Sequence, residues 1–89
     1  GPSGQAEIDT WKGISASELY DAYGKPAKSV DQPDGNTMVE FQHSDIDSST
    51  PYYCTVQYVI DSAGIVVSGG YEGNIGGCNR LIQTYQRAP

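Results

Sequence analysis

The stretch from Trp11 to Pro26, W-K-G-I-S-A-S-E-L-Y-D-A-Y-G-K-P, predicts one complete helix with a signal at each end. Ser15 is placed as the N-cap, and Glu18 follows three residues later, which is the spacing of a capping box. Gly24 supplies the left-handed residue that commonly ends a helix, and Pro26 prevents its continuation. Because a helix of about ten residues is not stable alone in water, the rest of the chain must provide a surface for it to cover.

Three later segments show the alternating pattern of β-strands, namely residues 37–43, 52–60 and 65–71. In the second and strongest segment, one face carries Cys54, Val56, Tyr58 and Ile60, and the other carries Tyr53, Thr55, Gln57 and Val59. Residues 27–36 show turn chemistry instead. The sequence therefore predicts an α+β fold, in which an N-terminal helix packs on a three-stranded antiparallel β-meander.

The two ends of the chain carry weaker signals. Residues 1–10 are predicted to be a tag remnant (Gly1-Pro2) followed by a short, polar, flexible leader, and residues 11–89 to be a single α+β domain. Trp11 is expected to pack against the sheet or the end of the helix. Residues 78–85 suit either a helical turn or a short terminal strand, and the sequence does not decide between them.

Cys54 and Cys78 are the two cysteines of the chain. Their spacing is neither a C-x-x-C motif nor a zinc pattern, since only one histidine is present to complete a metal site. A disulfide is favoured over two free, buried thiols, and it would tie the C-terminal segment back to the sheet. Such a bond indicates an oxidising compartment such as the periplasm.

Composition argues against several kinds of partner. The net charge is −6 and the five basic residues do not cluster, so neither a nucleic acid nor an anionic membrane surface is expected. No apolar run is long enough to cross a bilayer. The glycine-rich residues 69–77 lack the lysine of a phosphate-binding loop, and no small-molecule cofactor is predicted.

No set of residues predicts catalysis or metal binding. His43, Asp45 and Asp47 are close in sequence, but an EF-hand loop starting at Asp45 would need a glycine at its sixth position and a glutamate at its twelfth, and both are absent. We interpret this segment as a solvated loop whose Asp and Ser residues form turns. The chain is therefore expected to have no catalytic, cofactor-binding or metal-binding residues.

Binding of another protein is the function that the tyrosines favour. Seven tyrosines accompany a single phenylalanine, and tyrosine is enriched in binding patches. The candidate protein-binding residues are Tyr52, Tyr53, Thr55, Gln57 and Tyr71. Tyr53, Thr55 and Gln57 are predicted to lie on the side of the sheet away from the helix, and Tyr52 and Tyr71 are included as exposed tyrosines of the sheet and its loop ends. Two alternatives remain open: the tyrosines could simply cover a sheet face, and residues 78–85 could fold back over that face.

The motif W-x-G-x-S-x-x-E-L-x-x-x-x-G-x-P, followed by D-G-N-T-M-V-E-F and C-T-V-Q-Y-V-I-D-S-A-G-I-V, resembles the small Gram-negative lipoproteins of the SmpA/OmlA (BamE-like) class. The resemblance extends from Trp11 to Tyr71. The matching positions are Gly13, Ser15, Glu18, Leu19, Gly24, Pro26, Phe41, Val56, Tyr58, Ile60, Asp61, Gly64 and Val66. The class often has two helices before its sheet, and only one is evident in this sequence.

The resemblance implies a non-catalytic, periplasmic, protein-binding module that forms the soluble part of an outer-membrane lipoprotein in an envelope assembly. Its partner would be another envelope protein, and it would meet the membrane only through a lipid anchor upstream of Ser3. The alternative is a secreted or periplasmic enzyme inhibitor that uses the acidic, tyrosine-rich loop from Ser44 to Tyr53.

Overall fold

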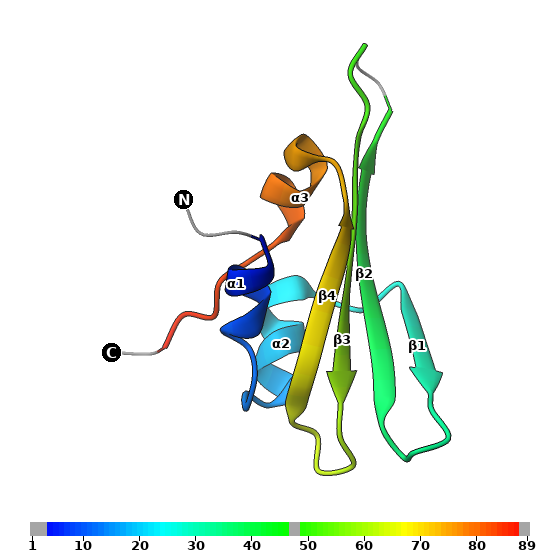
Figure 1. Cartoon of the computed structure of the whole chain (residues 1–89), viewed down its shortest axis with the longest axis vertical. Coiled ribbons are helices and arrows are strands. Elements are labelled where there is room, and N and C mark those ends of the chain that lie inside the picture. Colours follow the sequence, from blue (N-terminus) through cyan, green and yellow to red (C-terminus); the bar gives the residue numbers. More distant parts are fainter. Residues whose placement is uncertain (1–3, 47–48, 88–89) are drawn as a thin grey trace.

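The computed structural model describes residues 4–46 and 49–87 (Figure 1). The elements follow the order α1 (Gly4–Asp9), α2 (Ala16–Tyr23), β1 (Lys28–Asp31), β2 (Thr37–Asp45), β3 (Tyr52–Ile60), β4 (Val66–Gly73) and α3 (Ile75–Leu81). Each strand pairs antiparallel with the next, giving the sheet order β1-β2-β3-β4. Figure 1 shows the helices gathered on one side of the sheet. The α+β class is confirmed, but the sheet has four strands rather than three.

β1 is the strand that the sequence did not reveal. Its four residues, Lys28–Asp31, are all exposed, so they carry no alternation of apolar and polar side chains. The strand forms because its backbone pairs with β2, from Lys28 opposite Glu40 to Asp31 opposite Thr37. A short, charged edge strand of this kind limits pairing with other chains.

α1 replaces the predicted flexible leader, and that prediction is wrong for residues 4–9. The helix is held by one apolar side chain, Ile8, which is 1% exposed. Gln5 adds a hydrogen bond from its Nε2 to the carbonyl of Gly69 on β4, at 2.9 Å. Because this helix of 6 residues buries a single side chain, its sequence shows no repeating apolar pattern. Gly1 and Pro2, interpreted as a tag remnant, lie outside the described residues.

α2 has the ends that its sequence predicts. The side chain of Ser15 accepts a hydrogen bond from the backbone N–H of Glu18 at 3.3 Å, as an N-cap does. Gly24 has φ 84°, in the left-handed region, and its N–H donates to the carbonyl of Tyr20. Leu19 is fully buried beneath the helix.

The core lies between the sheet and the helices. The predicted inner face of β3 is confirmed, since its four members are all buried, and β2 contributes Val39 and Phe41 to the same core. The helices add Ile8, Leu19 and Cys78. Because all three helices bury residues in one core, they cover one face of the sheet.

The chain beyond α3 runs across an aromatic cluster as an irregular tail of residues 82–87. The open choice for residues 78–85 is thereby resolved into the end of α3 followed by this tail. Trp11 is 2% exposed and lies beside the rings of Tyr23, Tyr58 and Tyr85, so its predicted packing is confirmed. Its indole N–H donates to the carbonyl of Gln83 at 2.7 Å.

Candidate functional site

The face of the sheet opposite the helices is the candidate binding surface, and we call it the open face. The strand register places Glu40 of β2 opposite Gln57 of β3, and Gln42 opposite Thr55, on this side. Thr55 is in turn opposite Glu72 of β4. Other residues that the register assigns to the open face are Lys28, Val30, Met38, Ser44, Tyr53, Val59, Ser68 and Gly70. None of the described helices covers it.

A network of amides around Glu40 lies at the centre of the open face. Gln57 donates from Nε2 to Oε1 of Glu40 at 2.8 Å, and Gln42 donates from Nε2 to Oε2 at 2.6 Å. The hydrogen bonds from Gln57 and Gln42 lower the pKa of Glu40 below its ordinary value, because they stabilise the carboxylate. The three side chains shield one another, and Glu40 is only 9% exposed. The carboxylate is therefore held ionised in a fixed position.

A shallow depression adjoins this network. Its volume of ≈ 150 Å³ is smaller than the roughly 300 Å³ at which ligand pockets begin, and it is lined by Thr55, Gln57, Gly70, Tyr71 and Glu72. Gly70 contributes no side chain here, and the space above it is open. A depression of this size suits a side chain of a partner better than a cofactor.

The five predicted binding residues do not form one surface. Tyr53, Thr55 and Gln57 lie on the open face as predicted, and Tyr53 is 53% exposed. Tyr52 and Tyr71 lie on the helix side of the sheet, so they are separated from the other three. Neighbouring strand residues point to opposite faces, so Tyr52 cannot share the face of Tyr53.

The two tyrosines on the helix side have structural contacts. The guanidinium carbon of Arg80, on α3, lies 3.8 Å from the centre of the Tyr52 ring, in a cation–π contact. Tyr71 is opposite the buried Val56 in the sheet, and its ring lies beside Gly4 of α1. Both rings therefore help to seat helices on the sheet.

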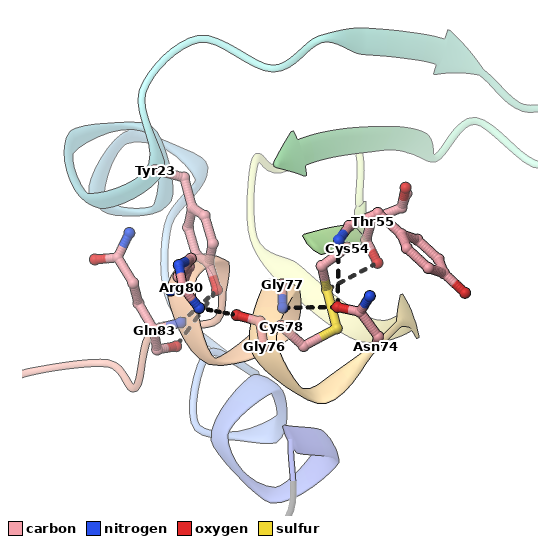
Figure 2. Close-up of a disulfide and its surroundings, with 10 residues drawn as sticks. Tyr23, Cys54, Thr55, Asn74, Gly76, Gly77, Cys78, Arg80 and Gln83 are labelled. Carbon is pink, nitrogen blue, oxygen red and sulfur yellow. Dashed lines mark hydrogen bonds between the residues drawn. A yellow bond between two sulfur atoms is a disulfide. The ribbon is translucent and has the colours of Figure 1, made fainter. Parts of the chain in front are cut away.

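The predicted disulfide between Cys54 and Cys78 is confirmed and joins β3 to α3 (Figure 2). The two Cα atoms are 4.9 Å apart. Gly77 allows this approach, because a Cβ on it would collide with the backbone of Tyr53. Asn74 caps α3 by accepting from the N–H of Gly77 at 2.8 Å. The glycine-rich segment thus serves close packing around the disulfide.

The segment with His43, Asp45 and Asp47 gives no site in the part that the structure describes. Asp47 lies outside the described residues, and His43 faces the helix side, opposite Cys54. Among residues 4–46 and 49–87, no group of three or more His, Cys, Asp or Glu side chains could hold a metal ion. In the same residues, no helix is long and apolar enough to span a membrane.

Glu40 is the feature of the open face that the sequence analysis missed. Alternation along β2 already places Met38, Glu40 and Gln42 on one side. Only the register between β2 and β3, however, brings Gln57 opposite Glu40.

Comparisons with protein-family models, with curated proteins and with solved structures found no match to this chain.

Proposed function

We propose that this chain is a non-catalytic module that binds another protein through the open face. The observation that carries the proposal is the make-up of this uncovered face. β3, one of the two inner strands, presents Tyr53, Thr55, Gln57 and Val59, without a charged side chain. The neighbouring Glu40 on β2 has its carboxylate occupied by hydrogen bonds from Gln57 and Gln42. The water-facing side of an antiparallel sheet is normally polar, and a depletion of charge with an exposed aromatic ring is typical of the core of a protein interface.

The proposed setting is the periplasm, with the chain as the soluble part of a small outer-membrane lipoprotein and another envelope protein as its partner. The disulfide supports an oxidising compartment. Two helices, α1 and α2, precede the sheet, which is the order that the resemblance to the SmpA/OmlA class implies. A full-length gene with an L-x-x-C signal just upstream of Ser3 would support the anchor, and an ordinary signal-peptidase site would oppose it.

The test of the open face is capture of partners from envelope extract with Thr55→Lys. Thr55 is partly exposed and lies opposite Glu72, which accommodates a lysine. The melting temperature should stay close to that of the wild type, while capture of the partner falls. Ser62→Lys adds the same charge in the exposed turn after β3 and should leave capture intact.

A second variant keeps the test decisive. Tyr53→Ala removes the most exposed aromatic ring of the open face without adding a charge. If both variants fold and capture the same partners as the wild type, the open face is not the binding surface and the proposal fails. Gln57→Glu is unsuitable for this test, because it would place a second carboxylate against Glu40.

An enzyme inhibitor is the second candidate, and Ile46 is the observation that favours it. This residue follows β2 in the connection to β3 and is 79% exposed. Exposed apolar side chains on a connecting segment are suited to insertion into a partner's cleft. Capture that is lost with Ile46→Asp and kept with Thr55→Lys would assign binding to this hairpin end instead of the open face.

A further inference from the structure

The tail of residues 82–87 lies in a groove between α1 and α2, which we call the tail groove. Side chains of the groove hold the backbone of the tail. Trp11 donates from Nε1 to the carbonyl of Gln83 at 2.7 Å, and the hydroxyl of Tyr23 accepts from the N–H of Gln83 at 3.0 Å (Figure 2 shows Tyr23 and Gln83). Thr10 accepts from the N–H of Tyr85 at 2.8 Å. Such contacts to the backbone would hold an extended segment of other sequence equally well.

Side chains of the tail are held as well. Gln83 donates from Nε2 to the carbonyl of Ala22 at 2.9 Å, Thr84 donates to Oε1 of Glu7 at 3.4 Å, and Tyr85 is held at both its ring and its hydroxyl. The ring of Tyr85 packs edge-on against Trp11, with 5.2 Å between ring centres. Its hydroxyl donates to Oε1 of Glu18 at 3.0 Å, and this hydrogen bond to a carboxylate raises the pKa of Tyr85. The groove therefore selects an aromatic ring that carries a donor, two positions after the residue held by Trp11 and Tyr23.

The tail does not fill the groove. A cleft of ≈ 290 Å³ remains beside it, lined on the helix side by Trp11, Glu18, Asp21 and Ala22. Two carboxylates thus stand on this wall, in a chain whose net charge is −6. The negative wall favours a positively charged segment, and the tail itself places Arg87 two residues after Tyr85.

The tail could detach without breaking a helix or strand. It forms no helix or strand, and the disulfide at Cys78 fixes α3 to β3, so detachment can stop at the end of α3. Gln83 and Gln86 are exposed even when the tail is docked. The contacts that would leave with the tail are the hydrogen bonds of Gln83, Thr84 and Tyr85 and the packing of Ile82 and Tyr85 against the core.

We propose that the tail groove is a docking site for an extended, cationic segment of a partner protein that carries a tyrosine, and that the chain's own tail occupies it as an internal competitor. The site is separate from the open face and lies on the opposite side of the sheet. It does not depend on the proposed function of that face.

The test measures binding in trans of a fluorescent peptide, I-Q-T-Y-Q-R-A-P, to the full-length chain by anisotropy. In Tyr85→Phe the ring still packs on Trp11, but the hydrogen bond to Glu18 is lost. The chain's own tail therefore binds the groove less tightly and competes less with the peptide. The peptide should bind this variant about tenfold more tightly than the wild type, as expected for loss of one hydrogen bond to a charged group. Gln86→Ala, in the neighbouring exposed position, should bind the peptide as the wild type does.

Two further measurements check the chemistry of the groove. A peptide with alanine in place of its tyrosine should not bind Tyr85→Phe. Adding Asp21→Asn to Tyr85→Phe should weaken binding of the intact peptide about twofold to threefold, the size of one exposed charge contact. Adding Thr55→Lys instead should change nothing, which separates the groove from the open face.

Two results would overturn the proposal. One is the absence of peptide binding, at millimolar concentration, to Tyr85→Phe that circular dichroism shows to be folded. The other is a wild-type chain that is dimeric in solution and becomes monomeric with Tyr85→Phe, because the groove would then take the tail of a second copy. Tyr85→Phe is used rather than Tyr85→Ala because it preserves the packing on Trp11.

Discussion

Ile8 of α1 lies directly against Gly69 of β4. A Cβ added to Gly69 would come 2.7 Å from Cγ2 of Ile8 and 2.8 Å from the ring of Tyr58. Those separations are shorter than carbon atoms tolerate, so only glycine lets the helix approach the sheet this closely. The position of α1 on the sheet therefore depends on a residue 61 positions later in the chain. No local sequence pattern around Ile8 reveals this dependence.

Gly69→Ala should destabilise the fold by about 1–3 kcal/mol, the usual range for overpacking a core. Gly70→Ala is the matched control, because a Cβ there meets nothing within 4 Å. Denaturant unfolding of the two variants would measure the difference. Equal stabilities would show that α1 does not rest on β4 as described.

Ser15→Ala should lower the free energy of unfolding by about 0.5–2 kcal/mol, because it removes the N-cap of α2. Ser17 lies two residues further, exposed and inside the helix, where alanine has the higher helix propensity. Ser17→Ala should therefore be neutral or slightly stabilising. Thermal unfolding of the pair gives the comparison, and an equal loss in both would contradict the capping role.

Removal of the disulfide should destabilise the fold by about 3–4 kcal/mol, as the chain-entropy model gives for a closed loop of this length. The two cysteines are 24 residues apart in sequence. Intact mass after alkylation without reduction should show no modified thiol. The midpoint of thermal unfolding should then fall on reduction; two alkylated thiols in the unreduced protein would disprove the bond.

Acid should lower the stability of the fold, because it protonates Glu40 on the open face. Its pKa is lower in the folded chain than the ordinary 4.5, because Gln57 and Gln42 donate to the carboxylate. The group thus contributes stability that is fully present above pH 4.5 and is lost as the pH falls through the folded pKa. Gln57→Ala should reduce this loss. Unfolding curves between pH 3 and pH 6 (roughly the range that brackets an ordinary carboxyl titration) would measure it, and an unchanged pH dependence would contradict the network.

Elements with their own local signals were predictable from the sequence. α2 carries its cap at Ser15 and its terminating residue at Gly24, and β3 alternates over its whole length. α1 and β1 lack such signals, because α1 buries one side chain and β1 buries none. These two elements exist through contacts with β4 and β2, and those contacts depend on the tertiary structure.

The candidate site was only partly predictable for the same reason. Alternation in β3 correctly placed Tyr53, Thr55 and Gln57 on the face away from the helices. Composition alone added Tyr52 and Tyr71, although their positions along the strands assign them to the other face. The hydrogen bond from Gln57 to Glu40 could be found only from the pairing of β2 with β3, and the sequence alone does not specify that pairing.

The bond from Trp11 to the carbonyl of Gln83 spans 72 residues. During folding, the side of the aromatic cluster that Gln83 covers at Trp11 therefore stays open until the tail has docked. The hairpins of the sheet join neighbours in the chain and can form earlier, whereas closure over Trp11 must come last. A chain truncated before Gln83 should leave its tryptophan accessible to a fluorescence quencher, and the chain that includes residues 83–87 should protect it.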